Sequence, residues 1–172
     1  SYCVVGTDNE KGGRMVGEHL LSKGCETCLF VGNIEHDEVK LRYEGAARAL
    51  GKKRLGHLHV PDFAYSSHYE AAMNKLGGTA SLPDAVFACS DTSAMAVISV
   101  LKERGVDVGK DIRVIGYNDV PSAAHFTPPL TTIRQDVERA GQVLVSKLMQ
   151  ILSGEDASSE KLETTLIHRQ SG

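Results

Sequence analysis

The sequence contains few aromatic residues and no tryptophan: aromatic side chains make up 5% of its 172 residues. It also lacks any apolar run near the roughly 18 residues that a membrane-spanning helix needs. No basic amino-terminal segment leads into an apolar stretch, so we expect no secretory signal peptide. The net charge of −3 and the isoelectric point of about 6.1 argue against a nucleic-acid-binding surface within this chain. These absences favour a cytoplasmic protein with no membrane partner.

Cysteine is also scarce, with four residues in the chain. Cys25 and Cys28 form a C-x-x-C, a spacing found in redox and metal sites. Redox pairs of this kind usually open a helix, whereas Cys28 leads into the apolar strand pattern LFVGN. His57 and His59 share one face of a strand pattern, but no second C-x-x-C or finger-like histidine pair completes a zinc set. We therefore expect buried or edge thiols and no metal.

Motifs of common enzyme classes are absent as well. No G-x-G-x-x-G follows a strand pattern, no G-x-S-x-G nucleophile elbow occurs, and no catalytic base is suitably spaced from Cys25. We predict a non-catalytic protein without a cofactor. Its 172 residues are 41% hydrophobic and 24% charged, which is typical of one globular domain with a sizeable core.

Helix and strand patterns alternate along almost the whole chain. Strand patterns occur in YCVVGTD, CLFVGN, GHLHV, DAVFACS, IRVIGYND and LETTLIHRQ. Helical spacing occurs in EKGGRMVGEHLLSKG, DEVKLRYEGAARAL, HYEAAMNKLGG and DTSAMAVISVLKERG. Strands that are apolar on both faces, separated by helices of about 10 to 15 residues, indicate an α/β fold with a parallel sheet flanked by helices. We expect Gly24 to end the first helix and Ser66 or Ser67 to cap the third.

The carboxy-terminal part of the sequence is less regular. LTTIRQ resembles an extended crossover, and DVERAGQVLVSKLMQILSG has a strongly amphipathic helical pattern. The side chains expected to face inward on this helix are Val137, Ala140, Val143, Leu144, Leu148, Ile151 and Leu152. An apolar face this broad needs a substantial partner surface, so the chain alone is expected to self-associate.

Polar residues directly follow three of the strand patterns. Asn33 comes after LFVG, Ser90 and Asp91 after VFAC, and Asn118 and Asp119 after VIGY. The carboxyl ends of parallel strands meet at one edge of a sheet, and ligands of such folds collect there. Two interpretations stay open: these side chains cap the following helices, or they form a polar ring that binds a ligand.

The segments VVGTDNEKGGRMVGEHLLSKG, LFVGN, LRYEGAARAL, VFACSDTSAMAVISVLKERG, DIRVIGYNDVPSAAHFTPPLTTIRQD and TLIHRQS closely resemble LacI/GalR-family bacterial transcriptional repressors. The resemblance is to the carboxy-terminal half of their effector-binding region and spans nearly all 172 residues. Its most specific element runs from Val114 to Asp136. It implies a type I periplasmic-binding-protein-like fold, in which two α/β subdomains joined by three crossovers hold a small effector.

The resemblance also implies a division of the chain. Residues 1–8 resemble the last strand of the amino-terminal subdomain and the first crossover, and residues 9–130 the carboxy-terminal effector-binding subdomain. Residues 131–155 resemble a crossover and the helix that packs on the amino-terminal subdomain. Residues 156–172 resemble the strand that returns to the carboxy-terminal subdomain.

Site residues follow from the resemblance position by position. The effector-contacting arginine of the family falls on Arg42 in KLRYEG, where a guanidinium can donate paired hydrogen bonds to vicinal hydroxyls or a carboxylate. Phe63 matches an aromatic position that stacks on the ligand ring. From the residues alone, a surface arginine and a core phenylalanine remain open alternatives.

The polar positions of the family cleft fall on Asp91 and Gln135, and two looser, ligand-specific positions fall on His36 and Glu38. Two residues depart from the family pattern. Ser90 stands where the family commonly has asparagine, and Asn118 stands where it often has aspartate. An amide in place of a carboxylate removes a charge and adds a donor, so no particular sugar can be carried over.

The function implied by the resemblance is the effector-sensing and dimerising part of a transcriptional repressor. Its effector would be a sugar, nucleoside or related molecule, and operator DNA would be bound only through an amino-terminal helix-turn-helix outside this chain. We expect a homodimer. The main alternative is a periplasmic sugar-binding receptor for transport, although PPLTTIRQD is repressor-like and four cysteines are awkward in an oxidising compartment. A nucleotide-dependent or thiol redox enzyme is a third hypothesis.

Overall fold

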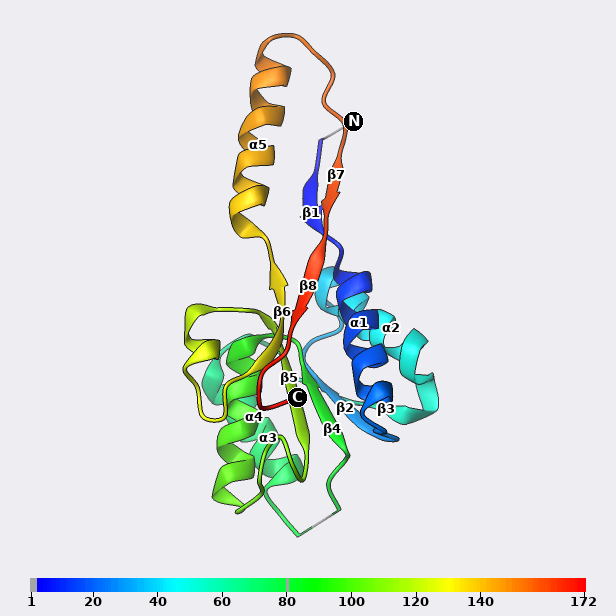
Figure 1. Ribbon diagram of the computed structural model, residues 1–172, viewed down its shortest axis with the longest axis vertical. Helices are drawn as coiled ribbons and strands as arrows, with labels where there is room; N and C mark the ends of the chain where they lie inside the picture. The colour runs from blue at the N-terminus through cyan, green and yellow to red at the C-terminus, as the bar shows by residue number, and fades with distance from the viewer. Residues whose placement is uncertain (1–2, 80) are drawn as a thin grey trace.

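The computed structural model describes residues 3–79 and 81–172, and its main body is a six-stranded sheet with helices on both faces (Figure 1). The strands of this sheet are β2 (Cys28–Val31), β3 (Leu55–Leu58), β4 (Ala85–Ala88), β5 (Arg113–Asn118), β6 (Thr131–Gln135) and β8 (Thr164–Ile167). They lie in the order β3-β2-β4-β5-β6-β8, and all neighbours are parallel except β8, which runs antiparallel to β6. The expected α/β fold with a flanked parallel sheet is confirmed.

Two pairs of helices cover the two faces of the sheet. On one face lie α1 (Asn9–Ser22) and α2 (Asp37–Leu50), and on the other lie α3 (Tyr65–Leu76) and α4 (Asp91–Glu103). Successive side chains of a strand point to opposite faces, so Phe30 packs toward α1 and α2 while Leu29 and Val31 pack toward α3 and α4. Both faces are buried, which is why these strands are apolar throughout.

Helices α1 and α2 approach each other closely because glycines lie at their contact. A Cβ atom on Gly13 would overlap the carbonyl oxygen of Arg42, and one on Gly45 would overlap the carbonyl oxygen of Glu10. Any larger residue would push the two helices apart. The two glycines therefore set the distance between α1 and α2, and with it the position of the first turn of α1 over the sheet.

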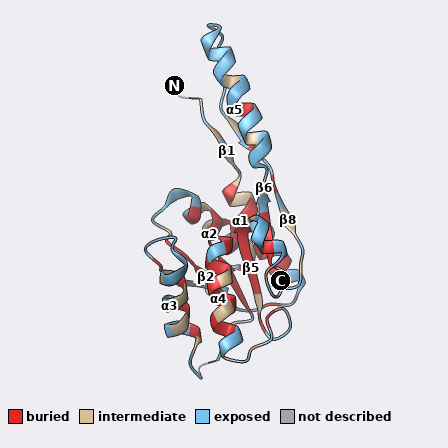
Figure 2. Ribbon diagram, turned by 90° about the vertical axis from the view of Figure 1, so that its left-hand side faces the viewer, coloured by how far each residue is buried: buried red, intermediate tan, exposed pale blue. Residues whose placement is uncertain are grey.

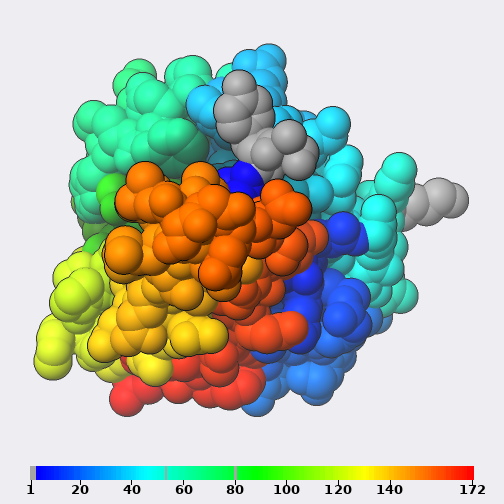
Figure 3. Space-filling view, turned by 90° about the horizontal axis from the view of Figure 1, so that it is seen from above, coloured from blue at the N-terminus to red at the C-terminus, as the bar shows by residue number. Residues whose placement is uncertain are grey.

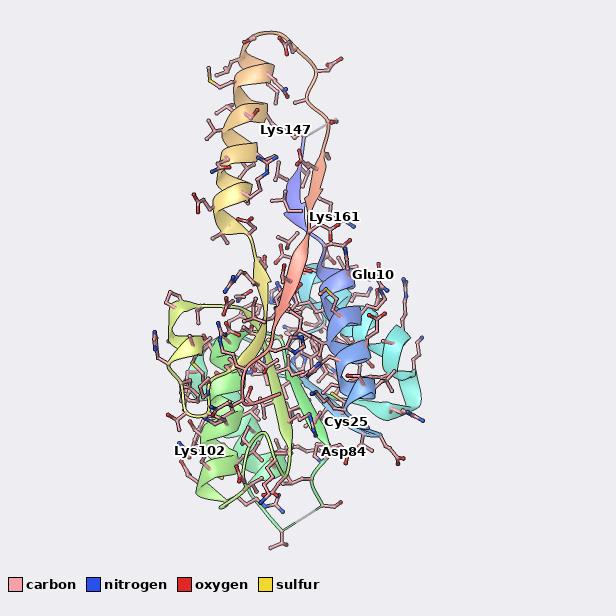
Figure 4. All side chains as sticks on the ribbon, in the orientation of Figure 1. Glu10, Cys25, Asp84, Lys102, Lys147 and Lys161 are labelled. Carbon is pink, nitrogen blue, oxygen red and sulfur yellow. The ribbon has the colours of Figure 1, made fainter. Side chains whose placement is uncertain are left out.

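A second, smaller unit projects from the sheet (Figure 1). It consists of β1 (Val5–Thr7), the parallel strand β7 (Glu160–Leu162) and the helix α5 (Val137–Leu152). Lys147 Nζ on α5 lies 3.3 Å from Glu160 Oε2 on β7, and Lys147 and Lys161 mark the two sides of this unit in Figure 4. Two short 3₁₀ turns, Lys52–Arg54 and Pro121–Ala124, complete the elements.

Most of the apolar side chains of α5 are exposed in this chain, which agrees with the expectation that this helix needs a partner surface that the chain alone does not supply. Of the seven residues named for this helix only Val143 is buried, whereas Val137 and Leu152 are 75% and 72% exposed. Figure 2 shows α5 almost entirely in the colour of exposed residues. The reason is geometric: α5 stands clear of the sheet and packs mainly against β1.

The predicted ends of the helices and strands agree with the structure in part. Gly24 follows α1 with a φ of +75°, and its N–H donates to the Leu21 carbonyl at 2.9 Å, as predicted. The cap predicted at Ser66 or Ser67 is wrong, because α3 already begins at Tyr65 and both serines lie inside it. The final strand pattern is divided into β7 and β8, and the first two residues of the chain lie outside the described residues.

The cysteines are free thiols, and those of the C-x-x-C are buried, as expected. Burial raises the pKa of the Cys28 thiol to about 12, so it remains protonated. Cys25 and Asp84 lie at the end of the sheet opposite to the start of α1, which Glu10 marks (Figure 4). Within residues 3–79 and 81–172, no three His, Cys, Asp or Glu side chains are arranged to hold a metal ion. The helices among these residues are too short or too polar to cross a bilayer.

Replacing Gly13 by alanine should destabilise the fold even though alanine is the better helix former. The added Cβ would overlap the backbone of α2, and overpacking of this kind costs about 1 to 3 kcal/mol of unfolding free energy. Gly141→Ala is the matched control, because no atom of another element lies within 4 Å of its new Cβ and alanine should stabilise α5 by about 0.5 to 1 kcal/mol. Chemical denaturation of both variants measures the difference, and equal effects would contradict the close helix contact.

Candidate functional site

The carboxyl ends of the parallel strands form one edge of the sheet, on the side from which β1, β7 and α5 project (Figure 1). Seen from above, α5 and the loop after it lie over the middle of this edge, between α3 and α1 (Figure 3). Arg42, Ser90, Asp91, Asn118 and Gln135 all contact the strand ends here. The structure therefore brings together the polar residues that the sequence proposed.

Arg42 is buried beneath this edge, with only 6% of its surface exposed. Its Nε donates to Asn9 Oδ1 at 2.8 Å, and its Nη1 donates to the Cys89 carbonyl at the end of β4 at 2.7 Å. The guanidinium carbon lies 3.9 Å from the centre of the Tyr117 ring, which supports the cation by a cation–π contact. Among the described residues its Nη2 has only the Glu38 carboxylate as an ionic neighbour, at 4.0 Å. The guanidinium is thus contacted from three sides. Its burial excludes the alternative that Arg42 is a surface arginine.

Asn118 and Gln135 join β5 and β6 to β1. Gln135 Nε2 donates to Asn118 Oδ1 at 2.8 Å, and Thr7 Oγ1 on β1 donates to Gln135 Oε1 at 3.0 Å. Asn118 and the next residue, Asp119, have φ angles of +114° and +56°. Asparagine and aspartate tolerate positive φ better than other non-glycine residues, which accounts for this pair directly after a strand. Gln135 therefore links the end of β5 to β1.

Asp91 is wholly buried, and both of its carboxylate oxygens are occupied. Oδ1 accepts from Thr132 Oγ1 at 2.6 Å and Oδ2 accepts from the Val120 N–H at 2.8 Å. Burial raises the pKa of Asp91 to about 6, against the opposing effect of these two hydrogen bonds. Asp91 thus ties α4 to β6 and to the turn after β5. The adjacent Ser90 caps α4, since its Oγ accepts from the Ser93 N–H at 3.2 Å.

Three predicted residues lie on the exposed rim of the edge. Phe63 is 49% exposed, which excludes a core phenylalanine, and its ring centre lies 5.2 Å from that of His36. Phe63 follows β3 and His36 follows β2, so neighbouring strands place them together. Glu38, in the first turn of α2, is exposed and lies beside Arg42. The rim therefore combines an aromatic ring, an imidazole and a carboxylate.

Sequence reasoning missed several residues of this region. Asn9 and Tyr117 hold Arg42, and Asp119 forms ion pairs with Arg134 and Arg169. Asp119 Oδ1 lies 2.8 Å from Arg169 Nη2, an ion pair whose geometry falls short of a hydrogen bond. Burial acts to raise the pKa of Asp119, but Arg134 and Arg169 outweigh this effect, and the pKa is lowered. The polar dipeptide after VIGY could have pointed to Asp119 as a residue of this edge. Its ion pairs could not be predicted, because Arg134 and Arg169 are distant from it in the sequence.

A polar hollow of about 540 Å³ lies beside the ends of β5 and β6 and the start of α5. Its lining includes Asn118 and Gln135 as well as the ion-paired Arg134, and it is completed by Asp119, Asp136, Val137, Glu138, Glu163 and Thr165. Four carboxylates line this hollow against one arginine, and the oxygens of both amides already accept hydrogen bonds within the protein, so the hollow is predominantly acidic and suits a polar ligand that donates hydrogen bonds.

Comparisons with known proteins agree with this architecture. The family model for the periplasmic binding protein-like domain matches residues 17–172. The chain belongs to the LacI/GalR family, in its periplasmic binding protein-like domain. A transcriptional repressor PurR from Mannheimia succiniciproducens is 34% identical over 158 residues, which is 89% of this chain and 47% of that protein. The chain thus spans about half the length of the curated relatives it matches.

Solved structures of the LacI/GalR family share the fold. A LacI-family regulator from Enterococcus faecium with bound ribose has a TM-score of 0.88 at 26% identity, over 98% of this chain and 65% of that one. A dimeric Lac repressor with a carboxy-terminal deletion has a TM-score of 0.88 at 27% identity, over 97% and 63% of the two chains. The type I periplasmic-binding-protein-like fold expected from the sequence is confirmed.

The raised pKa of Asp91 predicts a pH-dependent stability that Asp91→Asn should remove. A carboxyl with a pKa of about 6 when folded, above its ordinary value of 3.8, favours the folded state below about pH 4 and loses that contribution as the pH rises through 6. Relative to Asp91→Asn, the wild type should therefore lose about 2 kcal/mol of unfolding free energy between about pH 4 and 7. Urea denaturation at several pH values measures this, and a constant difference would contradict it.

Proposed function

We propose that this chain is the effector-sensing part of a LacI/GalR-type transcriptional repressor, with a sugar, a nucleoside or a similar small metabolite as its effector. The observation that carries the proposal is the buried Arg42 guanidinium, fixed in one orientation at the carboxyl edge of the sheet. A fixed guanidinium can donate hydrogen bonds to vicinal hydroxyl groups or to a carboxylate with little loss of entropy. The Enterococcus faecium regulator of the same fold was solved with ribose, which agrees with an effector of this class.

Each residue of the edge would contribute in its own way. Phe63 offers a platform for the apolar face of a ring, and His36 extends that platform because their ring centres are 5.2 Å apart. Asn118 Nδ2 has no protein partner among the described residues and remains free to donate to a hydroxyl. Both oxygens of Asp91 are engaged in the protein, so its role in this proposal is to hold α4 and β6 in place.

Sensing in this proposal is a shift between two arrangements of two subdomains. Residues 9–130 and 156–172 would form the effector-binding subdomain, and residues 1–8 and 131–155 would join it to a second subdomain. An effector that contacts both subdomains shifts the population toward the arrangement it binds more tightly. The hydrogen bonds from Thr7 to Gln135 and from Gln135 to Asn118 connect two of these passages directly to the binding edge.

DNA binding is proposed only for a helix-turn-helix outside this chain, since the net charge of −3 argues against a nucleic-acid-binding surface in the chain itself. We further propose that the chain forms a homodimer and that it is not catalytic. In this proposal it acts in the cytoplasm, where its thiols stay reduced. The dimeric Lac repressor of the same fold supports the dimer. A transport receptor has less support, because the curated relatives of the chain are repressors and its four cysteines are free.

Self-association of the chain should depend on the exposed face of α5. Leu148 is 54% exposed among other apolar side chains, and contact with a second copy would remove this surface from water. Sedimentation velocity over a range of concentrations should show a dimer or larger assembly, and Leu148→Glu should shift it toward monomer. Ser146→Glu places the same charge on an exposed position of α5 and serves as the control. A wild-type chain that stays monomeric at the highest concentration contradicts this prediction.

The proposed function is tested by effector binding. NMR titrations of the ¹⁵N-labelled chain with D-ribose, D-xylulose, D-galactose and adenosine should identify at least one ligand whose shifts map to the carboxyl edge. Phe63→Leu should weaken that ligand about three- to tenfold through lost stacking. Tyr65→Leu, which removes an exposed ring on α3, is the control and should leave the affinity unchanged. The proposal fails if none of these compounds binds, or if the shifts map elsewhere.

A further inference from the structure

Asn9 occupies a central position between the first crossover and the arginine of the site. It is the first residue of α1 and is 5% exposed. Its Oδ1 accepts the hydrogen bond from Arg42 Nε at 2.8 Å, and its Nδ2 donates to the carbonyl of Thr7 on β1 at 3.4 Å. One amide thus uses its acceptor for Arg42 and its donor for the crossover strand.

The local sequence leaves Asn9 little freedom. Asp8 caps α1 by accepting from the Lys11 N–H at 3.0 Å, which fixes where the helix begins. A Cβ on Gly12 would overlap the Tyr117 hydroxyl, so glycine there allows the first turn of α1 to lie directly against the ring that supports Arg42. The cap and the close contact together hold the Asn9 amide in place against the guanidinium.

The consequence for Arg42 is a fixed orientation of its guanidinium group. Nε is committed to Asn9 and Nη1 to the Cys89 carbonyl, while the Tyr117 ring covers one face. The Nη2 end is thereby turned toward Glu38 on the exposed rim. Without the Asn9 acceptor, the cation could rotate about its terminal bonds, and its Nε–H would be buried without a partner.

We propose that Asn9 is a positioning residue that orients Arg42 toward the effector and couples that orientation to the first crossover. The inference rests on the proposed sensing function. It adds that the affinity for the effector depends on a residue that does not touch the effector, and that a movement of β1 relative to the sheet acts on Arg42 through a single side chain.

The test compares Asn9→Ala with Asn9→Asp in the full chain. Two quantities are measured by NMR: the solvent exchange rate of the Arg42 Nε–H, and the affinity for D-ribose and for adenosine. Asn9→Ala should accelerate the exchange at least about tenfold and weaken binding about tenfold, the scale of one hydrogen bond to a charged group. Asn9→Asp restores an acceptor for Nε, so exchange should again be slow and affinity should return to within about twofold of the wild type.

Val16→Ala is the control for a merely structural effect. Val16 is buried on the same helix and packs in the core, so its truncation loosens α1 without removing either hydrogen bond of Asn9. It should lower stability and leave both NMR quantities near their wild-type values. The inference is overturned if Asn9→Ala matches Val16→Ala in affinity, or if Asn9→Asp fails to restore slow exchange. If the wild type binds neither probe, the proposed sensing fails for these ligands and the inference fails with it.

Discussion

Burial of the Arg42 guanidinium is the constraint on which the rest of this edge depends. A buried cation is costly unless its donors are satisfied, and desolvation lowers the pKa of Arg42 accordingly. The Arg42 cation is stabilised by an amide from α1, the carbonyl of the residue directly after β4, and an aromatic face from β5. Three elements must therefore converge on one side chain, and the glycines of α1 and α2 are what allow them to do so.

The same edge also gathers the passages of chain that enter and leave the sheet. Gln135 links β6 to β1 and β5, and Asp119 draws Arg134 of β6 and Arg169 of the carboxy-terminal segment to the end of β5. These contacts are polar and directional, unlike the apolar packing of the two helix layers. In the proposed function, these contacts would connect a displacement of β1 or of the segment after β6 to the edge of the sheet.

Periodicity and residue type were enough to predict the sheet, its covering helices and the polar residues at its edge. The range of α2 could be predicted because DEVKLRYEGAARAL has regular helical spacing between a polar loop and a glycine. What each polar residue contacts could not be predicted, because the partners are remote: Asp91 bonds to Val120 and Thr132, and Arg42 to Asn9. The amphipathic pattern of α5 predicted that its apolar face requires a partner, but such a pattern does not show where that partner lies.

Of the two interpretations of the strand-end residues, helix capping holds for Ser90, whereas the ligand-binding ring stays a prediction. The Ser90 hydroxyl oxygen accepts the capping hydrogen bond of α4, and both carboxylate oxygens of Asp91 accept hydrogen bonds within the protein. Both side chains are therefore engaged in holding the fold. Arg42 and Asn118 keep donors that the described protein atoms do not satisfy, and Phe63 keeps half of its ring exposed. In the proposed function, the internally bonded residues would form a rigid frame, and the remaining donors of Arg42 and Asn118 would face the effector. A frame that is already ordered would lower the entropy lost on binding.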